Sequence, residues 1–144
     1  MPKVRDILRQ KGNDVETIGP DATVLEAATR MNKRRIGALV VMHVEKVGGV
    51  FTERDVMNRV VATRKDPATT YVREVMTEKV ACCTLETTVE ECRTVMTNHK
   101  IRHLPVVDGD KLVGLLSSGD LLARELAAQE ETIRYLQEYV TGPN

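Results

Sequence analysis

The sequence predicts an α/β fold built from two β-α-β-β-α repeats, related by pseudo-twofold symmetry and followed by a long C-terminal helix. Three observations carry this prediction: an internal repeat, apolar residues whose spacing alternates between helical and strand periods, and turn residues between the segments. Residues 15–55 align with residues 80–120 at a constant offset of 65, and twelve of the 41 pairs are identical. A lead-in, Val4–Leu8, also resembles Val72–Met76. Two copies of one unit imply two related copies of any site that the unit carries.

The first repeat alternates helical and strand patterns. The predicted elements are a helix over Val4–Lys11, a strand over Val15–Ile18, a helix capped at Asp21 or Thr23, strands over Ala38–Val44 and Lys46–Thr52, and a helix over Glu53–Thr63. The cap at Thr23 is supported by Glu26 three residues later, which is the spacing of a capping box.

The second repeat has the same order. The predicted elements are a helix over Val72–Met76, a strand over Val80–Thr84, a helix capped at Thr88, strands over His103–Val107 and Lys111–Leu116, and a helix over about Gly119–Val140. Asp108-Gly109 predicts a tight hairpin between the two strands. The expected domain boundaries are residues 1–63 for the first repeat, 64–71 for a linker, 72–122 for the second repeat and 123–144 for the C-terminal helix and tail.

The last helix departs from the repeat. Its apolar spacing is heptad-like, with one polar member: Leu122, Leu126, Gln129, Ile133, Leu136 and Val140. Two interpretations stay open at this point, namely that this seam covers the protein's own core or that it forms a dimer contact.

Composition excludes several classes of function. The chain has 144 residues, with 42% hydrophobic and 29% charged residues, so we expect one compact body or two small ones that share a core. Lys+Arg and Asp+Glu both number 21, and aromatic residues make up 3%, which argues against a nucleic-acid partner. The sequence shows no membrane-length apolar run and no signal-peptide pattern, and its three cysteines suit a reducing compartment. We therefore expect a cytoplasmic protein without a membrane partner.

Each repeat ends in the same short motif, Gly-φ-φ-[Thr/Ser]-x-x-Asp, at Gly49–Asp55 and at Gly114–Asp120. Each repeat also has a Thr-Val helix start and a strand that follows an isoleucine. On these residues the chain resembles the CBS domain, named for cystathionine β-synthase, in the tandem arrangement called a Bateman module. The resemblance covers about residues 4–122 and is nearest to stand-alone CBS-pair proteins.

The resemblance implies binding of an adenosine-containing ligand, namely AMP, ADP, ATP or NAD(H), at sites that mix residues from both copies. Asp55 and Asp120 can accept the ribose hydroxyls, and Thr52 and Ser117 sit at helix N-caps, where hydroxyl and N–H groups favour an anion. The alternative is that these residues only cap their helices. Arg54, Arg102 and His103 are candidates for the phosphates, with a surface role at a strand or helix end as the alternative.

The base requires an apolar slot. The candidates are Ile18, Ile36, Met76, Val80, Ala81 and Ile101, each of which could equally belong to the core. The repeats are unequal here, because the second has Arg102-His103 where the first has Gly37-Ala38. We expect two different clefts, and favour the one that holds Arg102, His103 and Asp120.

The sequence therefore predicts a non-enzymatic regulatory sensor that binds an adenine nucleotide, forms a homodimer and acts in trans on an unidentified protein. Neither a glycine-rich nucleotide-binding loop nor a nucleophile beside a base is evident. His99 and His103 straddle a helix-to-strand junction, so we expect no metal. The alternatives are a ligand-free scaffold or interaction protein, and an S-adenosylmethionine sensor.

Overall fold

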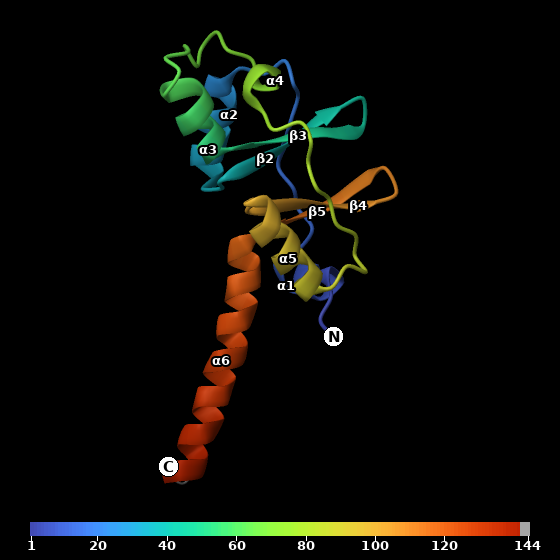
Figure 1. The fold of residues 1–144 in the computed structure, drawn as a ribbon, viewed down its shortest axis with the longest axis vertical. Helices are drawn as coiled ribbons and strands as arrows, with labels where there is room; N and C mark the ends of the chain where they lie inside the picture. The colour runs from blue at the N-terminus through green and yellow to red at the C-terminus, as the bar shows by residue number, and fades with distance from the viewer. Residues whose placement is uncertain (142–144) are drawn as a thin grey trace.

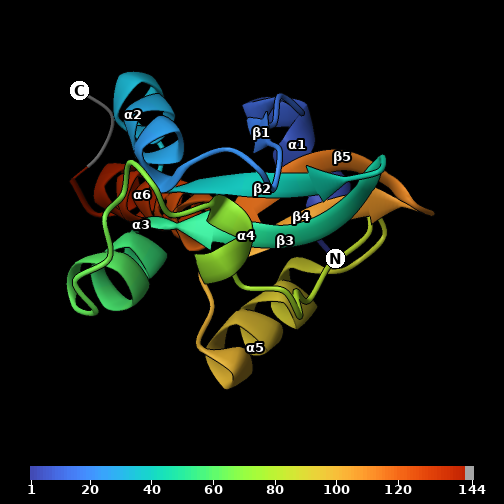
Figure 2. The same ribbon diagram turned by 90° about the horizontal axis from the view of Figure 1, so that it is seen from above.

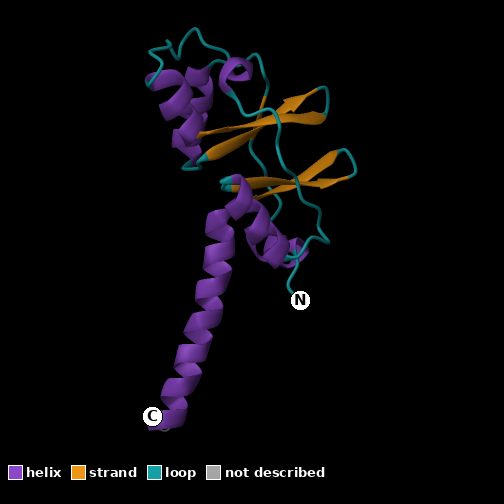
Figure 3. Ribbon diagram, in the orientation of Figure 1, coloured by secondary structure: helices purple, strands orange, loops and turns teal. Residues whose placement is uncertain are grey.

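The computed structural model describes residues 1–141, with side chains described through Glu130 and at Arg134 and Leu136. Two small sheets are stacked, and helices cover the outer side of each (Figures 1 and 2). The elements in chain order are α1 (Val4–Lys11), β1 (Thr17–Ile18), α2 (Val24–Arg34), β2 (Ala38–His43), β3 (Lys46–Thr52), α3 (Glu53–Asp55), the π-helix η1 (Val56–Val61), α4 (Val72–Val75), α5 (Val89–His99), β4 (His103–Asp108), β5 (Lys111–Ser117) and α6 (Ser118–Thr141). The predicted α/β fold of two repeats is confirmed (Figure 3).

The two sheets have the same central hairpin. In the first sheet, β1 pairs parallel to β2, and β2 pairs antiparallel to β3. In the second, β4 pairs antiparallel to β5. Both hairpins carry a register shift at the same place, after Val41 and after Val106. The registers place Ala38 opposite Thr52 and His103 opposite Ser117. Each hairpin thus brings the start of one strand beside the motif Gly-φ-φ-[Thr/Ser]-x-x-Asp of its repeat, which we call the signature motif.

The prediction of a strand over Val80–Thr84 is wrong, because within this segment only Cys83 forms a β-bridge, parallel to Val106. Cys83 N–H donates to Pro105 O at 2.9 Å, and Val107 N–H donates to Cys83 O at 2.9 Å. A longer ladder would need an N–H from residue 105, which proline lacks. In the first repeat the equivalent residue is Val40, whose N–H donates to Glu16 O at 3.2 Å. The single proline therefore shortens the edge strand.

The helix predicted over Glu53–Thr63 begins as expected but changes type. Thr52 caps it, since its hydroxyl accepts from the Asp55 N–H and its own N–H donates to the Asp55 carboxylate at 2.9 Å. One α-helical turn then gives way to η1, in which the Ala62 N–H donates to Met57 O at 3.0 Å. The π-helix widens the first turn beyond the signature motif, a feature common at functional sites.

The lead-in helices are exchanged between the repeats. Val4, Ile7 and Leu8 of α1 belong to the core of the second repeat, with Leu104, Val106 and Leu116 among its buried members. Val72 and Val75 of α4 belong to the core of the first repeat, with Leu39, Val41 and Phe51. The two halves are thus interlocked. The helix before the first repeat, α1, completes the second core, and the helix before the second repeat, α4, completes the first.

The long C-terminal helix is confirmed, and α6 projects away from the body of the molecule (Figure 1). Leu121 is its buried contact with the second core, whereas Leu122, Leu126 and Leu136 are about half exposed. The interpretation of the seam as a cover for the protein's own core is therefore wrong for these three leucines and for the exposed Gln129. The side chains of Ile133 and Val140 lie outside the described part.

Candidate functional site

A cavity of about 410 Å³ lies where the two repeats meet. The first repeat contributes the end of β3 and the start of α3 and η1. The second contributes the segment that follows α4 and the junction between α5 and β4. The lining residues are Val50, Thr52, Glu53, Arg54, Asp55, Asn58, Arg59, Thr77, Lys79, Val80, Ala81, His99, Lys100, Ile101, Arg102 and His103. We call this cavity the Asp55 cleft.

Asp55 lines the cleft and is itself buried, with 6% of its surface exposed. One carboxylate oxygen accepts from the Thr52 N–H at 2.9 Å and from its hydroxyl at 3.3 Å, and the other lies 3.6 Å from Arg59 Nε. Burial raises the pKa of Asp55, while the hydrogen bond from the Thr52 backbone and the Arg59 charge oppose the rise. A hydroxyl donor from a ligand would relieve this desolvation.

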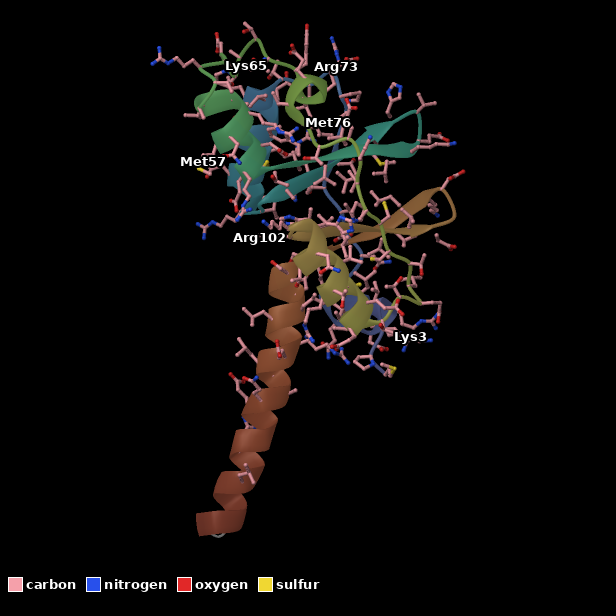
Figure 4. The ribbon with its side chains drawn as sticks, viewed as in Figure 1. Lys3, Met57, Lys65, Arg73, Met76 and Arg102 are labelled. Carbon is pink, nitrogen blue, oxygen red and sulfur yellow. The ribbon has the colours of Figure 1, made fainter. Side chains whose placement is uncertain are left out.

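Basic side chains surround the rest of the cleft. The lining includes Arg54, Arg59, Lys79, Lys100 and Arg102, against the two carboxylates of Glu53 and Asp55. Arg59 is held in place, since its Nη1 donates to Met76 O at 2.9 Å and to Val75 O at 3.3 Å. Arg102 lies at the start of the second sheet, near the level where the two halves meet (Figure 4). The surplus of positive charge suits an anionic ligand.

His103 connects the cleft to the signature of the second repeat. It lines the cleft and stands opposite Ser117 across β4 and β5. Burial lowers the pKa of His103, and so do the charges of Lys11 and Arg102, while Glu53 and Asp120 oppose the shift. The neutral imidazole is therefore favoured until a further negative charge arrives.

The apolar part of the lining comes from both repeats. Val80, Ala81 and Ile101 belong to the second repeat, and Val50 belongs to β3. Thr77 holds this wall against the first sheet, since its N–H and C=O exchange hydrogen bonds of 3.0 Å with Val50. Such a wall opposite a carboxylate can receive a planar base and its sugar.

The structure brings together most of the site residues predicted from the sequence. Those that line the Asp55 cleft are Thr52, Arg54, Asp55, Val80, Ala81, Ile101, Arg102 and His103. The grouping differs from the expectation in one respect, because Arg102 and His103 share this cleft with Asp55 and not with Asp120. The cleft thus combines the signature of one repeat with the basic strand start of the other.

The remaining predicted residues lie elsewhere. Ile18 is buried in the first core, and Met76 packs against that core and faces Gly49, where a Cβ would lie 2.9 Å from its sulfur. Ile36 lines a shallower hollow of about 480 Å³ beside α2. Ser117 and Asp120 cap α6 reciprocally, with hydrogen bonds of 2.8 and 3.1 Å. We call the group formed by Leu115, Ser117 and Asp120 the Asp120 site.

Half of the lining was not predicted from the sequence: Val50, Glu53, Asn58, Arg59, Thr77, Lys79, His99 and Lys100. Some signals were available, since Arg59 stands one helical turn after Asp55, and Lys79 directly precedes Val80. Lys100 adopts a left-handed conformation (φ 54°) that ends α5 and turns the chain into the cleft. No local sequence pattern predicts this turn.

Among the described residues, no group of three or more His, Cys, Asp or Glu side chains is arranged to hold a metal ion. Within the same part of the chain, no helix has the length and apolar character needed to cross a membrane.

Fold and cavity together define a class of protein, a paired-repeat α/β binding module with a cationic cleft between its halves. The chain belongs to the CBS domain family, which it matches over residues 4–62 and 72–126. It is 32% identical to the CBS domain-containing protein YhcV of Bacillus subtilis, over 88% of each chain. It is 29% identical to CBSX3 of Arabidopsis thaliana, which is named a mitochondrial protein, over 96% of this chain and 72% of that one.

Solved structures show the same architecture. The crystal structure of the CBS domain NE2398 matches with a TM-score of 0.83 and 42% identity, over 86% of this chain and 97% of that one. The CBS domain pair of MJ0100, solved with 5-methylthioadenosine and S-adenosyl-L-methionine, matches with a TM-score of 0.78 and 25% identity, over 90% and 98%. A hexameric CBS-CP12 protein from bloom-forming cyanobacteria matches with a TM-score of 0.75 and 27% identity, over 97% and 89%. CBS pairs are regulatory modules, and this chain is one of them.

Proposed function

We propose that this chain is a non-enzymatic sensor that binds an adenosine-containing ligand in the Asp55 cleft and acts in trans on a partner protein. One observation carries the proposal: a cavity of about 410 Å³ whose lining combines a buried carboxylate, apolar side chains and five basic side chains. A carboxylate that accepts ribose hydroxyls, a slot for a base and cations for phosphate are the three features that a nucleotide needs. The complex of MJ0100 with two adenosine compounds supports the same ligand class.

The charge of the lining favours a ligand with two or more phosphates. Five basic side chains face two carboxylates, and the pKa of one of these, Asp55, is raised by burial. A nucleoside diphosphate or triphosphate would neutralise the surplus, whereas the sulfonium of S-adenosylmethionine would add to it. We therefore favour ADP or ATP, or NAD(H) with its pyrophosphate, over AMP and over S-adenosylmethionine.

We assign a role to each part of the lining. Asp55 and Thr52 bind the ribose, and Val80, Ala81 and Ile101 contact the base. The phosphates are bound by the basic lining residues Arg54, Arg59, Lys79, Lys100 and Arg102. We also propose the domain division into residues 1–63, a linker over 64–71, residues 72–122, and a C-terminal helix and tail over 123–144. A cytoplasmic location is proposed as well, and the three free cysteines agree with it.

A homodimer is the assembly we propose, through a patch on the helices that follow the two signatures. Met57 and Val61 of η1 are 58% and 66% exposed, and Leu122 and Leu126 of α6 are 55% and 47% exposed. These pairs occupy equivalent positions of the two repeats, so the patch has the molecule's pseudo-twofold symmetry and is suited to contact its own copy. The hexameric CBS-CP12 protein supports assembly among similar chains.

The test is to denature the purified protein and identify the released small molecule by mass spectrometry. A thermal-shift series with ADP, ATP, AMP, NAD and S-adenosylmethionine complements it. We expect an adenine nucleotide with at least two phosphates, and a rise in melting temperature on adding it. A shift with S-adenosylmethionine alone would contradict the charge argument. No released ligand and no shift with any compound would favour the ligand-free scaffold.

A further inference from the structure

Lys11 fills the Asp120 site, because it pairs with the carboxylate that a ligand would contact there. Its ammonium nitrogen donates to Asp120 Oδ2 and to Leu115 O, both at 2.6 Å. Asp120 is the repeat equivalent of Asp55, the carboxylate to which we assign the ribose, and the same Oδ2 already accepts from the Ser117 N–H. The group that would receive a second ribose is therefore paired with a cation of the chain itself.

The backbone of Lys11 is fixed by packing and not merely by the ion pair. Leu8, one helical turn earlier on α1, fits against β5 so closely that a Cβ on Gly114 would lie 2.8 Å from its Cδ1. Gly12, with φ 90°, ends the helix directly after Lys11, and its N–H donates to Leu8 O at 2.7 Å. The helix thus presents Lys11 at the end of β5.

The second repeat has no counterpart to this extra helical turn. Six residues separate Leu8 from Val15, but only three separate Met76 from Val80. Correspondingly, α4 ends at Val75, and Thr77 already pairs with Val50 of β3, beside the open Asp55 cleft. The three additional residues of the first repeat lengthen α1 and deliver Lys11 to Asp120.

The Asp120 site also lacks positive charges that the Asp55 cleft has at equivalent positions of the repeat. Where the Asp55 cleft has Arg102 and Arg54, the equivalent residues are Gly37 and Gly119. Where it has Ala81, the equivalent residue is Glu16, which lies 3.4 Å from Arg34. The Asp120 site therefore has fewer uncommitted cations for phosphate, and its carboxylate is neutralised internally.

We propose that Lys11 is a specificity-determining residue that closes the Asp120 site, so that each chain takes one nucleotide, in the Asp55 cleft. This inference rests on the proposed function for the identity of the ligand. Removal of the ammonium group leaves Asp120 without its cationic partner and opens the second site.

Equilibrium dialysis with ADP tests the proposal. We expect the wild-type chain to bind one ADP, Lys11→Met to bind two with the second more weakly, and Lys11→Met combined with Asp55→Asn to bind one. Arg9→Met, at an exposed position of the same helix, is the matched control and should bind one. Thermal melts of each variant show whether it is folded.

The outcomes separate the two proposals. Two ADP on the wild-type chain, or one on both the wild type and Lys11→Met, would overturn the role of Lys11 and leave the proposed function intact. ADP bound by Lys11→Met but not by the wild type would overturn the assignment of the Asp55 cleft and keep the role of Lys11. Binding by neither protein would overturn both.

Discussion

Single residues divide the Asp55 cleft into parts with separate chemistry. Asp55 is buried, and this burial raises its pKa, whereas Arg102 directly precedes β4 and shares the lining with other cations. A change at one end should therefore affect one part of a ligand and not another.

Arg102→Met should weaken ADP binding by roughly 10- to 150-fold and leave adenosine binding within about twofold. Loss of a charged hydrogen-bond donor costs about 1.5–3 kcal/mol when the partner is a phosphate, and adenosine has none. Isothermal titration with both compounds measures the ratio. Lys33→Met, at an exposed position of α2, is the control. Equal losses for ADP and adenosine would assign Arg102 to the nucleoside instead.

The affinity for ADP should rise as pH falls from 8 to 6, and His103→Gln should reduce this rise by ~3- to 10-fold. Burial lowers the pKa of His103 from its ordinary value of 6.5, so the neutral form stabilises the fold above pH 6.5, and this contribution is lost as pH falls through the lowered pKa. A bound phosphate favours the imidazolium, so binding takes up a proton at His103, which otherwise faces Glu53, Asp120, Lys11 and Arg102.

Titration of ADP against both proteins at several pH values checks this. The ADP phosphate is the same in both titrations, so the difference between the two proteins isolates His103. Identical pH profiles would contradict the prediction.

The two hairpins have the same register but different turns. Val44 and Glu45 connect β2 to β3 with φ values of 49° and 62°, and Gly109 connects β4 to β5 with φ 62°. A left-handed backbone costs a non-glycine residue about 1 kcal/mol, most of all a β-branched one. The first hairpin is thus made with unfavourable residues where the second uses glycine.

Glu45→Gly should raise the free energy of unfolding by about 1 kcal/mol, because glycine adopts the left-handed conformation without the steric cost. Urea denaturation measures the change. Gly109→Ala, at the corresponding turn, should lower the same quantity by a similar amount. A neutral or destabilising effect of Glu45→Gly would indicate that the turn is not strained in solution.

At the scale of the whole molecule, the exposed patch combines equivalent positions of the two repeats, namely Met57 and Val61 of η1 with Leu122 and Leu126 of α6. Met57 lies on the outer side of η1, away from the sheets (Figure 4). Neither helix buries these side chains against its own core. A symmetric apolar patch of this kind is expected to contact the identical patch of another copy.

Met57→Asp combined with Leu122→Asp should convert the dimer into a monomer, since it places two charges in each contacting surface. Analytical ultracentrifugation measures the mass. Leu25→Asp, on an exposed face of α2 outside the patch, is the control and should remain dimeric. A wild-type chain that sediments as a monomer at high concentration would contradict the assembly.

The sequence was sufficient for features that depend on near neighbours. The Thr23 and Thr88 caps and both hairpins follow from residues within a few positions of each other, and all are present. The lost strand before Thr84 could not be predicted, because the missing N–H of Pro105 matters only once its pairing partner is known. Ile18 was ambiguous for a similar reason, since an apolar residue at a strand end suits a core and a base slot equally.

The grouping of site residues was beyond the sequence for a different reason. Asp55 and Arg102 come from different repeats, and their meeting depends on how the sheets stack. Lys11 was visible only as the last residue of a helix. Its approach to Asp120 follows from the exchange of α1 into the other core, which is a contact between segments over a hundred residues apart.

That exchange also determines what the covalent link between the halves contributes. The segment 64–71 is docked on the start of α2, where Pro67 O and Thr70 O accept from the Leu25 and Val24 N–H groups. Each half nevertheless holds a helix that the other half needs to close its interior. A proteolytic cut in this segment would break the chain without separating the pieces. The polypeptide would then behave as a two-part complex, in which either fragment alone exposes apolar surface and only the reunited pair regains the cleft.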